Sequence, residues 1–193
     1  MSNSRCSAKH MFAALLVLTV VAVAGTTQPQ QRITVQATAK GTSTQLGKQF
    51  PAKIIINSLS TAEDQKALVE GFKRSGHEGM LSALEKMSPK GRVAVEGSVG
   101  NDVKYIKELP SKTGRRFRLV TDRNIAFGEL YEGTRSREYS IGAAELVIMP
   151  DGKGAGTLLP ACKLKLDKKN NEVQIESYQN PWKLDHFIVH YGD

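Results

Sequence analysis

Short runs in which apolar and polar residues alternate fill the chain after Arg92, and they constrain its fold more than any other feature. Such runs are typical of half-buried strands, and here Gly, Pro, Asn and Asp separate them. Two earlier runs, Ile33–Lys40 and Phe50–Leu59, have the same character. About nine strands are expected, without the regular alternation of strand and helix that builds a parallel sheet. The sequence predicts a β-rich α+β fold: an antiparallel β-sandwich or a partly open barrel.

One segment, residues 60–88, departs from the strand pattern. Ser60-Thr61-Ala62-Glu63 fits a capping box, in which a hydroxyl and a carboxylate each bind a free backbone amide at a helix start. Apolar residues then recur at helical spacing, and Gly76 suits the end of a first helix. Pro89 and Gly91 stop a second helix. We therefore expect one helical hairpin inserted between strands.

The N-terminus has the features of a signal peptide. Arg5 and Lys9 precede an apolar run from Met11 to Ala24, which ends in Ala-Val-Ala, a cleavage sequence. The run is shorter than the ~20 residues that span a bilayer core. Cleavage after Ala24 would leave an exported protein, periplasmic or secreted, without a stable membrane span. An uncleaved N-terminal anchor is the alternative.

The rest of the chain reads as a flexible lead-in, residues 25–32, and one domain, residues 33–193. The whole chain has 27 Lys and Arg and 19 Asp and Glu; without the leader's two basic residues, the net charge falls from +8 to +6. This excess suits an anionic ligand or polysaccharide, or an acidic partner, although it is also an ordinary margin for solubility. Export argues against nucleic acid as the partner.

Side-chain chemistry is densest between Gly114 and Gly142. Arginine forks suit carboxylate, sulfate or phosphate, and tyrosine rings offer flat faces to a ligand. The candidate ligand-binding residues are Arg123, Tyr131, Arg135, Arg137 and Tyr139. Alternatively, the interleaved acids pair with these arginines and fix the loop to the sheet; those acids are Asp122, Glu129, Glu132 and Glu138. Arg116 and Arg118 share one face of a predicted strand, which we expect to be a solvated face.

No motif for catalysis or metal binding stands out. The G-x-S-x-G sequence of serine hydrolases is absent. His186 and His190 lie on one face of a predicted strand, where four residues separate the side chains by ~13 Å, too far for one ion. Cys162 is the single cysteine outside the leader, so no disulfide can form within the mature chain, and its apolar neighbours predict a buried, inert thiol. No catalytic residue, metal or cofactor is predicted.

Three blocks carry a resemblance to a known group of proteins. They are TDRNIAFGELYEGTRSREY at residues 121–139, KGAGTLLPACKL at 153–164 and LEKMSPKGRV at 84–93. The blocks resemble those shared by a family of exported bacterial proteins of unknown function. The resemblance implies export and a single domain, and it implies no activity and no catalytic residue.

Three hypotheses for function follow. The first is an exported, non-catalytic β-domain that binds a ligand or partner in the cell envelope or outside it. The second is a hydrolase that uses carboxylates or one of His77, His186 and His190; it requires a cleft where a histidine and an acid approach within ~3 Å. The third is a structural envelope protein, which requires an exposed apolar patch of several hundred Å².

Overall fold

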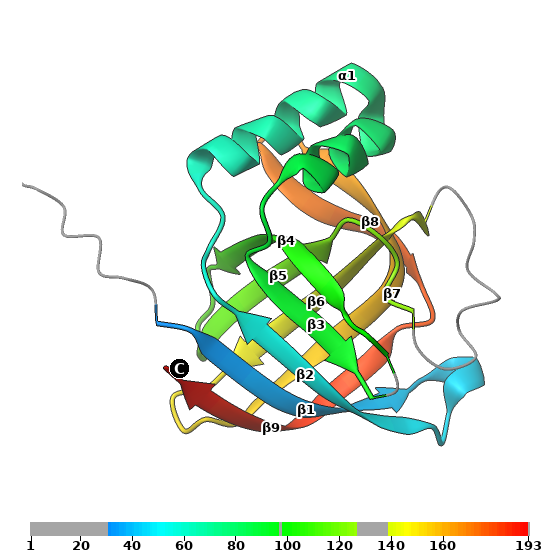
Figure 1. The fold of residues 1–193 in the computed structure, drawn as a ribbon, viewed down its shortest axis with the longest axis vertical. Helices are drawn as coiled ribbons and strands as arrows, with labels where there is room; N and C mark the ends of the chain where they lie inside the picture. The colour runs from blue at the N-terminus through cyan, green and yellow to red at the C-terminus, as the bar shows by residue number, and fades with distance from the viewer. Residues whose placement is uncertain (1–30, 97, 127–138, 193) are drawn as a thin grey trace, which may run out of the picture.

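Nine strands form a single antiparallel sheet in the computed structural model, which describes residues 31–96, 98–126 and 139–192. The strands are β1 (Ile33–Gly41), β2 (Gln49–Ile56), β3 (Gly91–Val95), β4 (Asn101–Leu109), β5 (Arg115–Thr121), β6 (Ile141–Ile148), β7 (Gly154–Asp167), β8 (Glu172–Gln179) and β9 (Trp182–Tyr191). One α-helix, α1 (Ala62–Lys86), and a 3-10 turn, η1 (Ser43–Gln45), complete the described elements. Figure 1 shows α1 above the strands.

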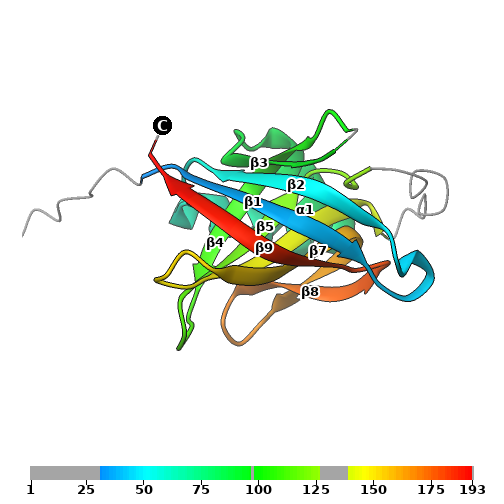
Figure 2. The ribbon, with the colours of Figure 1, turned by 90° about the horizontal axis from the view of Figure 1, so that it is seen from below.

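Eight of these strands close into a barrel. The order in the sheet is β6-β5-β4-β3-β2-β1-β9-β7-β8, and β6 also pairs with β7, which closes the ring. β8 stays outside the ring beside β7, as the view in Figure 2 shows. Closure is possible because β7 has 14 residues: its first part pairs with β6 and β9, and its last part pairs with β8. The predicted β-rich α+β class is confirmed, and the sheet is a closed barrel.

Apolar side chains fill the barrel interior. Along β1 the residues that alternate toward the inside, from Ile33 to Ala39, are almost completely buried. Larger side chains from other strands, such as Ile54, Phe117 and Trp182, occupy the same cluster. Each such side chain contributes about 1.5–3 kcal/mol through burial. Filling of this kind is expected for a ring of about eight strands, whose interior is just wide enough for side chains.

A second apolar core lies between α1 and the outside of the barrel. Leu68, Met80 and Leu84 of the helix are buried in the same cluster as Tyr105 of β4 and Val120 of β5. Cys162 of β7 also belongs to this cluster and is fully buried. Burial raises the pKa of its thiol to about 12. The prediction of a buried, inert cysteine is confirmed.

The capping box of α1 begins one residue later than the sequence suggests. Thr61 is the N-cap: its hydroxyl accepts from the backbone N–H of Asp64 at 3.2 Å, and the Asp64 carboxylate accepts from the Thr61 N–H at 2.9 Å. The Ser60 hydroxyl accepts instead from the N–H of Ile106 on β4 at 2.9 Å. Ser60 therefore ties the chain to the barrel, and Thr61 starts the helix.

The helix turns back on itself at Ser75 and Gly76, whose backbone angles are not helical, so it consists of two legs (Figure 1). Gly76 has a φ of 60°, which favours glycine. The legs touch at two further glycines: a Cβ on Gly79 would lie 1.9 Å from the carbonyl oxygen of Gly71. The break falls at Gly76, as the sequence predicts. In the described part of the chain, no helix has the length and apolar character to cross a membrane.

Candidate functional site

The predicted ligand-binding residues fall only partly within the described chain. Tyr131, Arg135 and Arg137 lie outside the described residues. Arg123 contributes its backbone carbonyl, which accepts from the N–H of Gly142 at 3.0 Å and from a threonine hydroxyl. Tyr139 is half-buried just before β6. The structure records no contact between Arg123 and Tyr139, the two described members of this set.

The acid next to Arg123 has a different partner from the one expected. Asp122 lies 3.5 Å from the ammonium group of Lys104 on β4, and both side chains are largely buried. The pairing of Asp122 with loop arginines is thus not observed among the described residues. Glu129, Glu132 and Glu138, the other acids of that hypothesis, lie outside them.

Two other arginines lie side by side and share one carboxylate. Arg116 and Arg118 lie on the outer face of β5, and both bind the carboxylate of Glu145 on β6. The Arg116 Nη2 is 2.9 Å from one carboxylate oxygen, and the Arg118 Nε is 2.7 Å from the other. The expectation of a plain solvated face is therefore wrong, because the largely buried carboxylate of Glu145 holds both guanidinium groups in place.

Strand register explains this arrangement. Arg118 and Glu145 are direct partners in the β5–β6 ladder, and Arg116 pairs with Val147, two residues further along β6. A residue on one strand contacts its direct partner and its diagonal neighbour on the same face. Glu145 therefore lies between the two guanidinium groups. A single carboxylate holds both in fixed positions.

Arg118 also connects the barrel to β8. Its Nη1 donates a hydrogen bond of 2.6 Å to the carbonyl oxygen of Val173. Close by, Lys107 of β4 and Glu172 of β8 form an ion pair at 3.4 Å. These contacts hold β8 against the outer face of β4 and β5. The strand outside the ring thus becomes one wall of a groove whose other wall is the barrel.

We name this depression the arginine groove, and it consists of two adjoining hollows. The larger, of about 710 Å³, is bounded by the β4–β5 turn and by β6 and β7. The smaller, of about 310 Å³, is bounded by β5, β6 and β8. Both include Arg116, Glu145 and Thr157 in their walls, so the hollows adjoin at these residues. Lys112 lies at the larger hollow, and Tyr178 lies at the smaller one.

The electrostatics of the groove favour an anion. Burial acts to raise the pKa of Glu145, but the hydrogen bonds from Arg116 and Arg118 outweigh it and hold that pKa below its usual value. Glu145 is therefore ionised at neutral pH. Its charge offsets only one of the three basic side chains in the walls, Lys112, Arg116 and Arg118. The groove keeps a net positive charge.

The two arginines differ in what they can offer a ligand. The Arg118 side chain is only 12% exposed, and its donors bind Glu145 and Val173. The Arg116 side chain is 41% exposed, and Glu145 is its only partner among the described residues. Arg118 is therefore a structural link, and Arg116 is the guanidinium that a ligand can reach.

The sequence contains one signal that points to this cluster. Glu145 stands in the apolar run AAELVIM, where a carboxylate inside a buried strand needs a cationic partner. Arg116 and Arg118, on one face of the preceding strand, are suitable partners. The missing information is which strands are neighbours, and it comes only from the fold.

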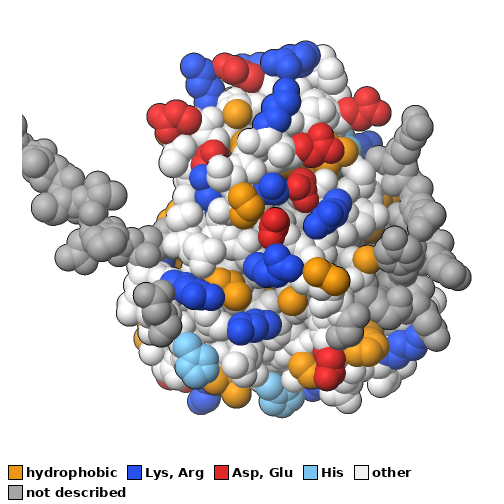
Figure 3. All heavy atoms as spheres, viewed as in Figure 1, with side chains coloured by type: hydrophobic (Ala, Val, Ile, Leu, Met, Phe, Trp, Pro, Cys, Tyr) orange, Lys and Arg blue, Asp and Glu red, His pale blue; other side chains and the backbone are white. Residues whose placement is uncertain are grey.

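The face that carries β1 to β4 looks different. Figure 3 shows basic and acidic side chains interleaved over the middle of this face. The ion pairs include Arg92 with Asp102 at 3.0 Å and Lys90 with Asp64 at 3.2 Å. Alternating, paired charges give no surface of a single sign. This face is therefore a weaker candidate for an anionic ligand.

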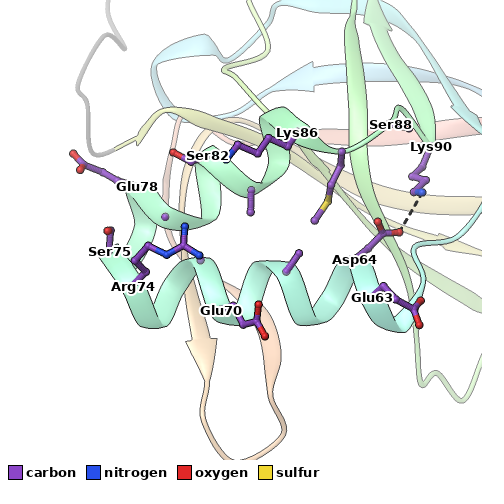
Figure 4. A pocket seen from close by; sticks show the side chains of 15 residues that line it. Glu63, Asp64, Glu70, Arg74, Ser75, Glu78, Ser82, Lys86, Ser88 and Lys90 are labelled. Atoms are coloured by element: carbon purple, nitrogen blue, oxygen red, sulfur yellow. Dashed lines mark ion pairs between the residues drawn. The ribbon is translucent and has the colours of Figure 1, made fainter.

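A separate hollow, of about 600 Å³, lies between the two legs of α1, away from the arginine groove (Figure 4). Its floor consists of small residues, among them Gly71 and Gly79, so the hollow follows from the close approach of the legs. Arg74 lies between the legs, and the Asp64–Lys90 pair lies at the other end. Charges of both signs line this hollow without converging on one point.

The histidines were candidates for catalysis, and two of them have specific partners. His77 accepts from the backbone N–H of Leu164 at Nδ1, at 3.2 Å, so its proton is on Nε2, which lies 3.1 Å from the Ser140 hydroxyl. A general base for a serine needs a free Nε2, which is the opposite arrangement. Burial, followed by the charge of Lys163, lowers the pKa of His77 and keeps the ring neutral. His77 therefore connects α1, β7 and the segment before β6.

His186 lies at an irregularity in β9. Two residues of β9 lie opposite Ala37 of β1, and His186 has a φ of 51°. Its Nδ1 is 2.6 Å from the Asp185 carboxylate, which also binds Lys40 at 2.8 Å. His186 lines a hollow of about 560 Å³ on the outer face of β1, β2, β3 and β9. In the described chain no three His, Cys, Asp or Glu side chains form a metal site.

Comparison with known proteins adds no identity. No family model, curated protein or solved structure matches this chain. The resemblance to exported bacterial proteins therefore stays a prediction, and function is argued from the site alone.

Proposed function

We propose that this protein is an exported, non-catalytic barrel domain that binds an anionic ligand in the cell envelope or outside it, through the arginine groove. The observation that carries the proposal is the position of Arg116. Its guanidinium is fixed by Glu145, partly exposed, and shared by both hollows of a groove with net positive charge. A fixed, accessible guanidinium binds carboxylate, sulfate or phosphate with little loss of side-chain entropy.

The fold supports a site on the outer surface. Apolar side chains fill the barrel interior, and large ones such as Phe117 and Trp182 are completely buried there. A ligand of any size would have to displace this packing to enter the barrel. The outer groove needs no such displacement, because both of its hollows are already open.

A non-catalytic role fits the chemistry of the nucleophiles. Ser140 faces the protonated nitrogen of His77, so that histidine cannot take its proton. The Cys162 thiol is buried, and its pKa is raised to about 12. A nucleophilic thiol requires the opposite shift and partial exposure.

The experiment compares two substitutions that remove the same charge. Arg116→Gln changes the groove, and Arg92→Gln changes an arginine of similar exposure whose partner is Asp102. Binding is measured by calorimetry against polygalacturonate, dextran sulfate and poly-L-glutamate at low salt. We expect at least one polymer to bind the unaltered protein, with about tenfold weaker binding for Arg116→Gln and little change for Arg92→Gln. Equal losses in the two variants, or no binding of any polymer, would refute the proposal.

A hydrolase is the second candidate, and one observation favours it. Asp185 orients the exposed His186 beside the hollow on β1, β2, β3 and β9: the histidine and the acid are 2.6 Å apart, within the hydrogen-bond reach of about 3 Å that acid–base catalysis requires. The pair leaves the His186 Nε2 directed away from Asp185, available as a base. A panel of aryl esters tests the idea: hydrolysis that disappears in His186→Gln but persists in His190→Gln supports it, and hydrolysis equal in all three proteins excludes it.

A further inference from the structure

We infer that the ligand of the arginine groove is an extended acidic polysaccharide, bound along several sugar rings, rather than a single small anion. This inference rests on the proposed function, because it names the ligand class of the same site. Three features carry it: the length of the groove, the separation of its cationic groups, and the aromatic ring at one end.

The length of the groove comes from the side-by-side position of its two hollows. Each hollow alone, at about 710 Å³ and about 310 Å³, is in the size range that holds a drug-sized molecule. They meet at Arg116, Glu145 and Thr157. A ligand that occupies both must therefore be elongated and must pass Arg116 where the hollows adjoin.

The cationic groups are separated, which disfavours a small anion. A tight site for one sulfate or phosphate brings several donors to one point. Here Arg118 is only 12% exposed and already donates to Glu145 and Val173, so it adds charge but leaves few donors for a ligand. Lys112 lies in the wall of the larger hollow only, and Arg116 lies where the hollows meet. Two separated cations match a chain that carries a negative group on successive units.

The aromatic ring gives the preference for sugar over other polyanions. Tyr178 lies at the smaller hollow and is 53% exposed, beside the half-buried Ile175. An exposed tyrosine offers a flat apolar face together with a hydroxyl, as a sugar ring requires. The same walls contain polar groups for sugar hydroxyls, namely Thr157, Gln174 and Ser111. An inorganic polyanion or polyglutamate has no ring to stack on this face.

The test is a length series. Calorimetry is carried out with galacturonate oligomers of one to eight units, sulfated oligosaccharides of the same lengths, neutral dextran oligomers and poly-L-glutamate. We expect affinity to rise by about tenfold or more from the single unit to the longest acidic oligomers, with much weaker binding of neutral sugars and of polyglutamate. The carboxylated and sulfated series distinguish the two sources of negative charge.

Substitutions at one end of the groove complete the test. Tyr178→Ala is compared with Tyr178→Phe, which keeps the ring, and with Tyr191→Ala, a tyrosine of similar exposure on β9 that is not in the groove wall. We expect Tyr178→Ala alone to weaken binding of long acidic oligomers by about fivefold to tenfold. Circular dichroism confirms that each variant folds.

The outcomes separate this inference from the proposed function. Arg116-dependent binding that is equal for single units and long oligomers, or equal for polyglutamate and sugar, refutes the inference and leaves the proposed function intact. Binding of long acidic oligomers that does not change in Arg116→Gln refutes both, as does the absence of any anion binding. Unchanged affinity in Tyr178→Ala refutes the role of the ring.

Discussion

Arg118 on β5 donates a 2.6 Å hydrogen bond to the carbonyl oxygen of Val173 on β8, while its Nε binds Glu145 at 2.7 Å. One buried guanidinium therefore joins three strands, although β5 and β8 are not neighbours in the sheet. The wall of the arginine groove depends on this residue. Arg116, two positions earlier, binds only Glu145 among the described residues and is half-exposed.

The two arginines should therefore differ in their effect on stability. Arg118→Met leaves the Val173 carbonyl and half of the Glu145 carboxylate without partners in a mostly buried place, and we expect it to cost about 2–3 kcal/mol. Arg116→Met removes a more exposed ion pair and should cost less than about 1 kcal/mol. Urea unfolding followed by tryptophan fluorescence measures both. Equal losses would show that Arg118 does not link β8 to the barrel.

Glu145 should make stability depend on pH in the acidic range. Burial opposes ionisation, but the two arginine hydrogen bonds outweigh it, so the pKa in the folded state lies below the ordinary value of 4.5. A carboxyl with a lowered pKa adds stability that is complete above the ordinary value and is lost as the pH falls through the folded value. We expect the unfolding free energy to fall less between pH 5 and acid in Glu145→Gln than in the unaltered protein. Glu96→Gln, at an exposed position, is the control.

His77 should give a dependence of the same direction at a pH nearer to neutral. Burial lowers its pKa from 6.5, so the unfolded chain binds a proton more readily than the folded one. Its contribution is complete above pH 6.5 and decreases as the pH falls below it. His77→Gln should remove this dependence and, at pH 8, cost about 1 kcal/mol because Leu164 loses its acceptor. Unfolding at a series of pH values tests this, with His190→Gln as the control; an unchanged slope in His77→Gln would contradict the neutral, hydrogen-bonded ring.

The two legs of α1 approach too closely for side chains at their crossing. Gly79→Ala would place a Cβ 1.9 Å from the Gly71 carbonyl oxygen, so the legs must separate. We expect a loss of about 1–3 kcal/mol, although alanine favours helix more than glycine does. Ser82→Ala, on the same leg, lacks this contact and serves as the control. Thermal unfolding of both variants gives the result, and a stabilised Gly79→Ala would mean that the legs cross differently.

The expected signal peptide gives a prediction that does not involve the fold. If residues 1–24 are removed on export, the protein purified from outside the cytoplasm should begin at Gly25. Mass spectrometry of the intact protein identifies this end. An N-terminus at Met1 in an exported fraction would instead support the uncleaved anchor.

Local patterns predicted the elements, and non-local pairing decided the architecture. The alternation in Ile33–Lys40 identifies a strand because one face of it is buried. The sequence predicts a capping box that starts at Ser60, and the structure has it at Thr61. Both pairs, Ser60 with Glu63 and Thr61 with Asp64, fit the spacing. Only the contact of Ser60 with Ile106 on β4 distinguishes them.

The site was harder to predict than the strands. Arg118 and Glu145 are 27 residues apart, and no local pattern shows that they face each other across neighbouring strands. Closure of the barrel has the same origin, because β7 pairs with β6 on one edge and with β8 and β9 on the other. The density of arginine and tyrosine in the sequence instead predicts a site at Arg123 and in the loop after it. Most of that loop lies outside the described residues.

A closed ring of strands has no free edge with which a strand of another molecule can pair. β8, which lies outside the ring, provides such an edge. It pairs only with β7, so within the described chain its second edge has no strand beside it. Such edges are the places where sheets of separate molecules join. The guanidinium of Arg118 already binds the Val173 carbonyl, and Glu172 and Glu176 on the same strand form ion pairs with Lys107 and Lys163. We therefore expect the contacts that shape the groove to disfavour pairing of β8 with a strand of another molecule.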